Sequence, residues 1–513
     1  MLQTEIIKNR ERKGAFYTPK IWVELSQKYL TDVLGEDWQD EYYIWDCACG
    51  TGNLLAGLTN KYNIYASTLD RQDIDVIKDR IKNGANLLED HTFQFDFLND
   101  DFTKLPQSLQ NIINDPEKRK KLVVYINPPY AEAATADRQG NKIGVSETKI
   151  KNKYASLIGK ANNELFTQFL IRIYAEIPNS KIANFSTLKN LQSSNFKDFR
   201  KIFQAKLEKF FLVPADTFDN VKGSFPIGFF IYDTSKKEVF KEMLGDIYDE
   251  KGSYDGEKSV ICYDDCKYIN DWYKKFYNNK GQEVGILNTR GNDFQNQNYI
   301  HISTGNNFNH TSLITKNNIL EACVYVAVRQ CIEATWLNDR DQFLFPNVGW
   351  ETDNEFQNDC LAFSLFDGQN KITSSEGTNN WIPFTEQELN AREKFESNFM
   401  TNFIKGKLKQ EDSALFGGKE QRTTPLEFSA EAKAVFDAGR ELWKYYHLQP
   451  NCNVNASLYD IREHFQGRSA AGKMNNKSKD ETYSLLITDL RNKLKELAQK
   501  IAPKVYEYGF LKG

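Results

Sequence analysis

The stretch that most constrains the fold is residues 121–130, where an apolar run ends abruptly in Asn-Pro-Pro-Tyr at residues 127–130. The run at 121–126 is rich in β-branched residues and predicts a short buried strand. Two prolines cannot continue a hydrogen-bonded ladder, so the strand must stop at a stiff, extended corner. In open α/β sheets ligands bind at this edge, where the corner offers an amide, backbone carbonyls and an aromatic ring. Taken alone, the motif fits an ordinary strand-to-loop turn equally well.

A second constrained stretch follows the strand-like run at residues 43–46, which ends at Asp46. The turn after it contains Gly50 and Gly52, which allow tight curvature and the close approach of a ligand to the backbone. The turn lacks the third glycine of the dinucleotide fingerprint, and no Lys-Ser or Lys-Thr follows it. Phosphate binding of the P-loop kind is therefore not expected.

Two more strand-like runs lead to acidic residues, the first to Asp70 and the second to Asp96. An acid at the first position could hold the hydroxyls of a ribose, with Asp73 as the alternative. An acid at the second could accept from an adenine amino group while Phe97 packs on its ring. Each alone could be a solvated acid at a strand end. Three successive repeats of strand, acid and loop before the proline corner favour a built ligand site.

The segment before the first strand predicts an amphipathic helix over about residues 21–34. Thr18 stands directly before Pro19, so we expect Thr18 as the N-cap and the proline in the first helical position. A helix start with free N–H groups can seat a carboxylate. A plain capped helix is the alternative for these residues.

Taken in order, these motifs resemble those of the γ-class adenine-N6 DNA methyltransferases. The matching residues are Gly-Ala-Phe-Tyr-Thr-Pro at 14–19, Asp-Cys-Ala-Cys-Gly-Thr-Gly-Asn at 46–53 and Asn-Pro-Pro-Tyr at 127–130, and the resemblance spans residues 10–235. It implies an α/β fold, a Rossmann-like methyltransferase sheet with helices on both faces. It also implies S-adenosyl-L-methionine as cofactor, double-stranded DNA as partner, and a place in a restriction-modification, phage-defence or epigenetic system. One departure is Cys47, where the family commonly has proline.

The resemblance also implies roles for individual residues. Thr18 would contact the methionine carboxylate, Asp70 the ribose, and Asp96 the adenine. The full set expected to hold the cofactor is Tyr17, Thr18, Asp46, Ala48, Gly50, Gly52, Asp70, Asp96, Phe97 and Asn127. The target base would be held by the catalytic set Asn127, Pro128, Tyr130 and Phe225. For Phe225, stacking on the base and packing in the core are both open, and no metal is expected.

The expected reaction is methyl transfer to the N6 amine of a flipped-out adenine. The Asn127 side-chain oxygen and the Pro128 carbonyl would accept from this amine, favour a more pyramidal nitrogen and expose its lone pair. Direct displacement then needs orientation above all. Cytosine carbon-5 chemistry would need a nucleophilic cysteine, typically in Pro-Cys, and the sequence has no Pro-Cys. Two alternatives are a protein glutamine-amide methyltransferase and a non-catalytic DNA-binding subunit of a modification complex.

We expect two domains, a methyltransferase catalytic domain at residues 1–235 and a target-recognition or DNA-binding region at 236–513. The second region should be mixed α+β and include an amphipathic helix over 483–501. The polar, basic residues 131–163 predict a loop over the active-site face, and residues 196–207 predict a basic helix. The α/β pattern is expected to stop near residue 235.

Composition limits the partners. With 66 basic and 70 acidic residues the net charge is −4, so a DNA-binding chain must gather its positive charge on one face. Eight cysteines without disulfide or zinc spacing fit a reducing cytoplasm. The resemblance implies a bacterial or phage protein that acts near the nucleoid. No signal peptide and no apolar run near the ~20 residues of a membrane helix are present. We expect a monomer without membrane contact, acting alone or with a separate restriction endonuclease or specificity subunit.

Overall fold

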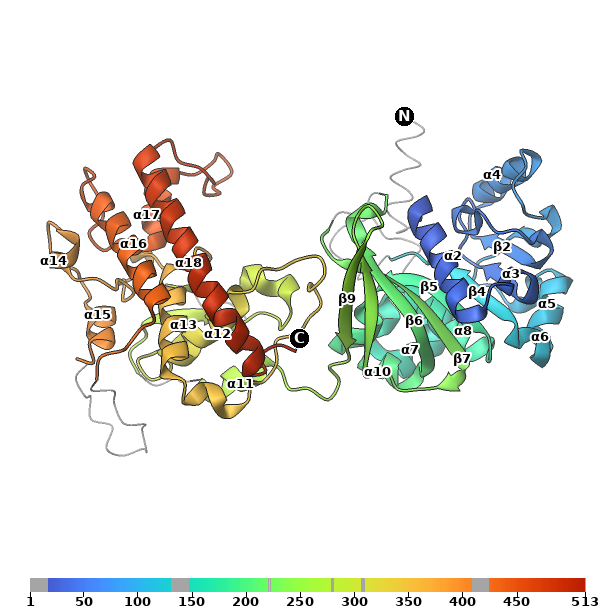
Figure 1. The fold of residues 1–513 in the computed structure, drawn as a ribbon, viewed down its shortest axis with the longest axis horizontal. Coiled ribbons are helices and arrows are strands. Elements are labelled where there is room, and N and C mark those ends of the chain that lie inside the picture. The colour runs from blue at the N-terminus through green and yellow to red at the C-terminus, as the bar shows by residue number, and fades with distance from the viewer. Residues whose placement is uncertain are drawn as a thin grey trace. The chain divides into compact units, whose positions relative to one another are not determined.

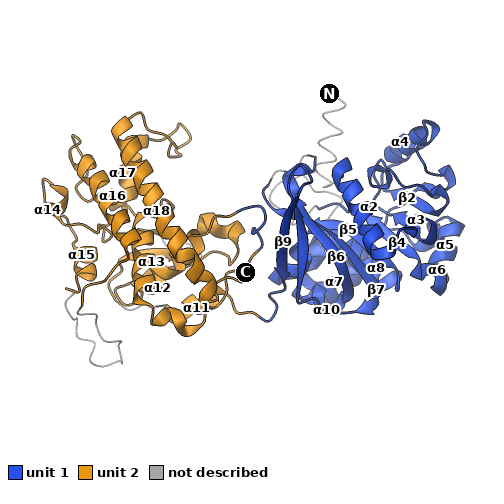
Figure 2. Ribbon diagram, in the orientation of Figure 1, with its two compact units in different colours: residues 1–265, 335–340 blue, residues 266–334, 341–513 orange. Residues whose placement is uncertain are grey.

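The computed structural model describes residues 17–130, 147–219, 221, 223–277, 281–305, 310–407 and 424–512, so residues 14–16 of the first motif lie outside it. The chain divides into two compact units (Figure 2). The first comprises residues 1–265 and 335–340, and the second comprises residues 266–334 and 341–513.

The first unit is built on a nine-stranded sheet in the order β3-β2-β1-β4-β5-β7-β6-β8-β9 (Figure 1). The strands are β1 (Tyr43–Asp46), β2 (Ile64–Thr68), β3 (Thr92–Gln94), β4 (Leu122–Ile126), β5 (Lys181–Thr187), β6 (Ala205–Pro214), β7 (Pro226–Lys237), β8 (Glu242–Tyr248) and β9 (Tyr254–Ile261). Strands β1 to β5 pair in parallel, and β7 runs antiparallel to both β5 and β6. The strand order reverses between β1 and β4, and ligands bind at the carboxyl edge of such a switch point.

Helices cover both faces of this sheet (Figure 1). They are α2 (Lys20–Leu34), α3 (Trp38–Glu41), α4 (Arg71–Lys82), α5 (Gln107–Asn114), α6 (Pro116–Lys120), α7 (Lys149–Ile158), α8 (Leu165–Glu176), α9 (Lys189–Gln192) and α10 (Lys197–Ile202). Successive strand residues point to opposite faces. Accordingly Tyr125 packs with Trp22 of α2, whereas Val124 and Ile126 pack with Phe166 of α8. The predicted α/β fold with a Rossmann-like sheet is confirmed.

Two local predictions between β4 and β6 are wrong. Part of the segment predicted as a loop is α7, because Ile150, Tyr154 and Ile158 recur four residues apart and are buried. The lysines between them obscured this period, and residues 131–146 of the same prediction lie outside the described part of the chain. The predicted helix at 196–207 ends at Ile202, since the chain enters β6 at Ala205.

The sheet also continues past residue 235, where the α/β pattern was expected to stop. Strand β8 pairs in parallel with β6, joining Phe211 to Asp246, and β9 closes this edge as its antiparallel neighbour. Both strands mix exposed, partly buried and buried positions and carry charged side chains, which hid their β character in the sequence. The first compact unit therefore extends to residue 265.

The second unit is mixed α+β. Its antiparallel sheet, in the order β11-β10-β12, consists of β10 (Gly285–Asn288), β11 (His301–Ser303) and β12 (Thr311–Ile314). Its helices are α11 (Ile269–Tyr273), α12 (Ile319–Gln330), α13 (Asn354–Phe366), α14 (Glu386–Leu389), α15 (Phe399–Ile404), α16 (Ala430–His447), α17 (Leu458–Gln466) and α18 (Glu481–Glu507). Helix α18 contains the predicted amphipathic helix and buries Leu490 and Leu497. Among the described helices, none combines the length and the apolarity needed to cross a bilayer.

Candidate active site at the carboxyl ends of β1 and β4

The glycine turn and the proline corner come from neighbouring strand ends. Strands β1 and β4 pair in parallel with Trp45 opposite Val124. Their carboxyl ends, at Asp46 and Ile126, therefore reach the same edge of the sheet at the switch point. The corner at Asn127 and the turn after Asp46 therefore lie side by side. Both motifs directly follow a strand, so the parallel pairing of the two strands is enough to bring them together.

The turn after β1 is closed by backbone hydrogen bonds. The Gly52 amide donates to the Cys49 carbonyl at 2.8 Å, and the Cys49 amide donates to the Ser67 carbonyl of β2 at 3.0 Å. Gly50 and Gly52 have φ angles of +51° and +82°, in the left-handed region that favours glycine. The two glycines are therefore required by the shape of the turn.

Asp46 is a buried carboxyl, 1% exposed, at the start of this turn. The Ala48 amide donates to its Oδ1 at 3.0 Å. Burial raises the pKa of Asp46 to about 8, and only the Ala48 hydrogen bond opposes this rise. Among the described residues, no basic side chain contributes to the shift. A buried carboxyl without a neighbouring cation suits a ligand that brings its own positive charge.

Asn127 is half-buried, and hydrogen bonds hold both ends of its amide. Its Nδ2 donates to the Thr18 Oγ1 at 2.8 Å, and its Oδ1 accepts from the Tyr130 hydroxyl. Loss of water around the phenol raises the pKa of Tyr130 well above its usual value. Pro128 directly follows Asn127 in the sequence and is buried. It lies beyond the end of β4 at Ile126.

The predicted N-cap role of Thr18 is wrong. Helix α2 begins at Lys20, and Pro19 takes the N-cap position with φ −59° and ψ 146°. The extended ψ of the proline delays the helix by one residue, so the Thr18 side chain points away from the helix cap and binds Asn127 instead. Tyr17, also expected at the cofactor, is half-buried and directly precedes Thr18.

Phe225 lies at the same sheet edge, directly before β7. Its carbonyl accepts from the Ala215 amide at 3.0 Å. Its partly buried ring packs on the apolar cluster that also supports the Tyr130 ring. The structure thus brings Phe225 to the edge that carries Asn127, where its ring contacts the core and keeps part of its surface exposed.

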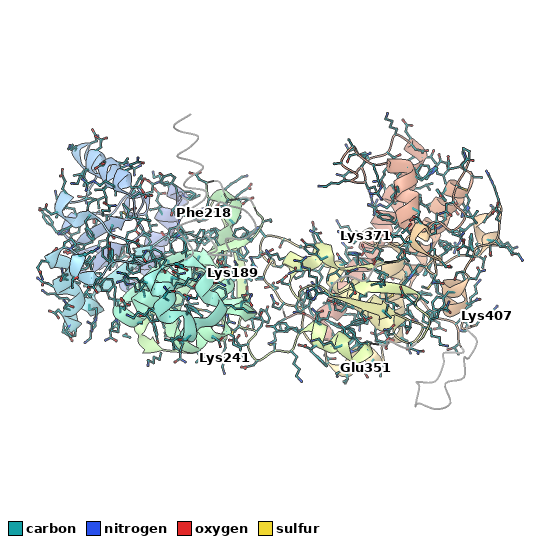
Figure 3. All side chains as sticks on the ribbon, turned by 180° about the vertical axis from the view of Figure 1, so that it is seen from behind. Lys189, Phe218, Lys241, Glu351, Lys371 and Lys407 are labelled. Atoms are coloured by element: carbon teal, nitrogen blue, oxygen red, sulfur yellow. The ribbon has the colours of Figure 1, made fainter. Side chains whose placement is uncertain are left out.

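Two more segments reach this edge, one after β5 and one after β6. They carry Lys189 and Phe218, which are labelled in Figure 3. Lys189 pairs with the carboxylate of Glu164, and Phe218 is buried with its ring centroid 5.9 Å from that of Phe185. Both side chains are thus held by neighbouring elements of the first unit.

The expected ribose acids stand at the next strand end. Asp70 is half-exposed and takes the N-cap position of α4, just after β2. Asp73 lies one turn further on, where its Oδ2 accepts from the Thr68 hydroxyl at 3.4 Å. Asp70 is closer to the end of β2 in the sequence, whereas the Asp73 carboxylate contacts the last residue of that strand, so both acids stand at this strand end.

The expected adenine contacts follow β3. Asp96 Oδ1 accepts from the amides of Leu98 and Asn99 at 3.0 and 3.1 Å, which folds the chain into a tight loop. Phe97 is 3% exposed, and its ring stacks on Phe169 with centroids 5.0 Å apart. The structure thus places Phe97 mainly in the aromatic core beneath the loop.

Two arginines that support these loops were not predicted from the sequence. Arg80 donates to the Thr51 carbonyl at 2.7 Å and so pins the outer side of the glycine turn. Buried Arg172 donates to the Phe97 carbonyl and, at 2.9 Å, to the Asp100 carbonyl. Both lie on helices far along the chain from their partners, where sequence spacing carries no signal for such contacts.

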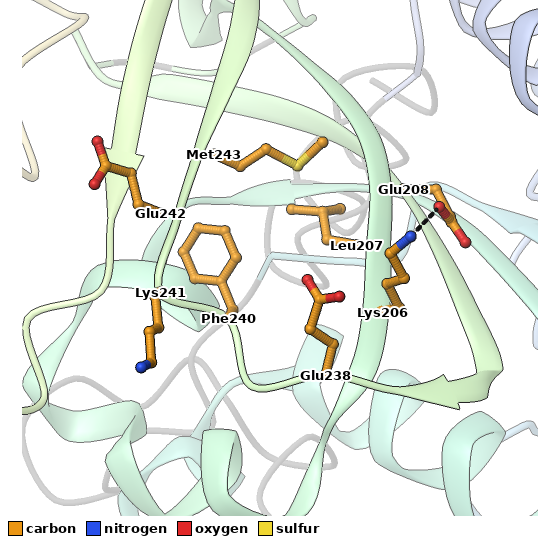
Figure 4. A pocket seen from close by; sticks show the side chains of 8 residues that line it. All are labelled: Lys206, Leu207, Glu208, Glu238, Phe240, Lys241, Glu242 and Met243. Atoms are coloured by element: carbon orange, nitrogen blue, oxygen red, sulfur yellow. Dashed lines mark hydrogen bonds and ion pairs between the residues drawn. The ribbon is translucent and has the colours of Figure 1, made fainter.

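A separate hollow of about 240 Å³ lies near the beginning of β6, at the opposite end of that strand from Pro214 (Figure 4). Its rim combines Lys206, which pairs with Glu208 at 3.0 Å, with apolar Phe240 and Met243. It therefore belongs to the other edge of the sheet and holds none of the predicted site residues.

No protein-family model matches the chain, and no curated protein matches it. Solved structures show a partial likeness. The DrdV–DNA complex aligns over 47% of this chain and 28% of its own, with 16% identity and a TM-score of 0.36. The type IIG restriction endonuclease BpuSI aligns over 45% and 27%, with 18% identity and a TM-score of 0.32. The type I restriction enzyme EcoKI M protein aligns over 45% and 48%, with 13% identity and a TM-score of 0.28.

The aligned part spans less than two thirds of each of these solved chains. With TM-scores below 0.5, the functional assignment of this chain rests on the geometry of its own site.

Proposed function

We propose that the chain is an S-adenosyl-L-methionine-dependent DNA methyltransferase that acts on the N6 amine of adenine. The observation that carries the proposal is the pairing of two strand ends at the switch point. One presents a buried carboxyl, Asp46, and the other an oriented amide, Asn127. A cationic methyl donor and an exocyclic amine are the two partners that such a pair suits.

The cofactor site fits the methyl donor by charge and shape. The carboxyl of Asp46 would meet the positive charge of the methionine portion, and the positive φ angles of Gly50 and Gly52 let the backbone approach it closely. The buried Thr51 hydroxyl has no hydrogen-bond partner among the described residues, so a ligand could also satisfy this group. When bound, S-adenosyl-L-methionine supplies the methyl group that is transferred.

The outer part of the cofactor would lie along the next strand ends. Asp70 after β2 would bind the ribose hydroxyls, and Asp96 after β3 would accept from the adenine amine. Phe97, with its ring 3% exposed and stacked on Phe169, would support the adenine loop from the core beneath it. Tyr17, Thr18 and Ala48 would complete the methionine end.

The target base would occupy the other half of the site. Such a base cannot be reached inside a duplex and must be flipped out. Asn127 Oδ1 and the Pro128 carbonyl would accept from its amine, while Tyr130 and Phe225 stack on its faces. Each ring would contribute roughly 1–3 kcal/mol, as base–aromatic stacking does elsewhere.

The second unit is proposed to recognise the DNA. Its segment at residues 294–299 exposes Asn298 and Tyr299, and the Arg290 guanidinium lies over the Tyr299 ring with its carbon 4.2 Å from the centroid. Amide side chains can read adenine edges in the major groove, and arginine can contact phosphates or guanine.

The direct test compares methyl transfer by the unchanged protein and Asn127→Ala. The substrate is genomic DNA free of adenine methylation, and the cofactor carries a labelled methyl group. We expect Asn127→Ala to lose at least ~10²-fold in rate, the usual loss when an oriented polar group is removed from a reacting centre, while cofactor affinity falls much less because Asp46 keeps the charge that meets the methyl donor. Exposed Asn114 at the end of α5 provides the matched control, because Asn114→Ala removes the same group far from this edge. Equal transfer by both variants would refute the proposal.

A further inference from the structure

The amide of Asn127 has two chemically different ends, and only one suits an amine. Its oxygen accepts hydrogen bonds, whereas its nitrogen only donates them. A half-turn of the amide would exchange these atoms and set an N–H donor against the donating amine of the base. The proposed reaction therefore depends on a group that keeps the oxygen on the substrate side.

The Thr18 hydroxyl is placed to do this. It accepts from the Asn127 Nδ2 at 2.8 Å. Once its own proton is donated to the carboxylate of the proposed cofactor, the hydroxyl could only accept, so a flipped amide would face it with an oxygen and lose this bond. The Tyr130 hydroxyl donates to Oδ1 on the other side of the same amide. These two contacts place the amide nitrogen at Thr18 and the amide oxygen at Tyr130.

The position of Thr18 is itself rigid. Thr18 is 6% exposed and precedes Pro19, whose ring restricts the backbone. The Pro19 carbonyl accepts from the amides of Trp22 and Val23 at 3.0 and 3.1 Å. Trp22 is completely buried, and its Nε1 donates to the Thr217 hydroxyl at 2.8 Å. The start of α2 thus fixes Thr18 against the body of the sheet.

We propose that Thr18 is the positioning residue that keeps the acceptor oxygen of Asn127 directed to the target base. The Tyr130 hydroxyl holds the same oxygen until the amine replaces it, and its proton stays on the phenol throughout. This inference rests on the proposed function and deepens it, since it gives Thr18 a role in the chemical step. A hydroxyl has one donor and two acceptor lone pairs, so the proton of Thr18 can still serve the cofactor carboxylate.

The main test compares Thr18→Val, which keeps the side-chain shape without the hydroxyl, with Thr18→Ser, which keeps the hydroxyl. Rates are measured at saturating cofactor and DNA, so that any change in affinity drops out. We expect kcat of Thr18→Val to fall by about 10²-fold, the scale of a misplaced reacting group. Thr18→Ser should recover to within about fivefold of the unchanged protein, since its hydroxyl restores the bond. An unchanged kcat in Thr18→Val, with Asn127→Ala inactive, would overturn the inference and leave the proposed function standing.

Tyr130→Phe tests whether the phenol hydroxyl holds the Asn127 oxygen only until the amine of the base replaces it. The variant keeps the stacking ring and removes only the hydroxyl. In the proposed reaction this hydroxyl releases the Asn127 Oδ1 before the methyl group is transferred. We expect kcat to fall clearly less than in Thr18→Val, because the stacking ring is kept and the lost hydroxyl bond is one that the amine replaces. A loss as large as that of Thr18→Val would show that the phenol bond persists in the reacting complex and would overturn this part.

A measurement without turnover separates the inference from the proposed function. Hydrogen exchange of the Asn127 side-chain NH₂ group is followed by NMR in protein selectively labelled at asparagine. The Thr18 bond should slow this exchange in the unchanged protein and in Thr18→Ser, and Thr18→Val should exchange faster. Equal exchange in all three would overturn the inference even if the protein transferred no methyl group. Absence of transfer with the expected exchange pattern would instead count against the proposed function alone.

Discussion

The ends of β1 and β4 lie side by side, yet they prepare for their ligands in opposite ways. At the end of β1, Asp46 is buried beside one backbone amide, and its environment raises its pKa. At the end of β4, Asn127 is half-buried, uncharged and bound at both ends by hydroxyl groups. The first site is selective through charge, because its carboxyl is costly to ionise until a cation arrives. The second is selective through hydrogen-bond direction, because the amide of Asn127 would present its oxygen, and not its nitrogen, to the target base.

The largest expected effect is the loss of cofactor affinity when the charge of Asp46 is removed. Asp46→Asn keeps the shape and the acceptor for the Ala48 amide but removes the charge. We expect cofactor affinity to fall by about 10²-fold, since the loss of a buried charge partner costs about 2–5 kcal/mol. Isothermal titration of the cofactor-free protein measures this change, with Asn127→Ala as the matched variant at the neighbouring strand end. Similar losses of cofactor affinity in both variants would mean that cofactor binding and base binding are not separated between the ends of β1 and β4.

A second expectation concerns stability without cofactor. Because burial raises the pKa of Asp46 from 3.8 to about 8, this group lowers the free energy of unfolding as pH rises from about 4 to 8. Asn has no charge to bury, so Asp46→Asn should unfold with a free energy higher by roughly 1–3 kcal/mol at pH 7.5. The difference should shrink as pH is lowered through the unfolded-state pKa of 3.8, below which Asp46 is protonated in both states. Denaturation curves at several pH values measure this, and a destabilised variant at pH 7.5 would make the carboxyl a structural group.

The smallest expected effect is the pH dependence of binding. Below a pKa of about 8 the Asp46 carboxyl is protonated, so a cationic ligand must displace its proton. Affinity should therefore rise with pH, by about 25-fold between pH 6.5 and 8.5, and level off above the pKa. The ratio of affinities between the unchanged protein and Asp46→Asn isolates this group from the titration of the ligand. A ratio constant across this range would show that Asp46 is already charged before binding.

Local sequence patterns predicted the parts of the site that a single strand end defines. The strands that end at Asp46 and Ile126, and the turn at Gly50 and Gly52, follow from apolar runs, glycines and prolines within a few residues. The neighbouring position of the two ends required only the parallel order of a Rossmann-like sheet. These features were predictable because their causes are local.

Features that depend on distant partners were not predictable in this way. Thr18 and Asn127 are 109 positions apart, and the hydroxyl was assigned to a helix cap because the local pattern favours one. Strands β8 and β9 lack the apolar pattern of the inner sheet; β8 joins the sheet by pairing in parallel with the non-consecutive strand β6, and β9 joins it as the antiparallel partner of β8. The raised pKa of Asp46 reflects burial by the whole fold, which no short pattern encodes.

The most direct test of the central claim is the chemical identity of the methylated product. Purified protein is incubated with unmethylated genomic DNA and cofactor labelled in its methyl group, and the DNA is digested to nucleosides. The two-ended site predicts label in N6-methyldeoxyadenosine, lost in Asn127→Ala and retained in Asn114→Ala. Label on a cytosine, label in protein glutamine, or no label in DNA would contradict it.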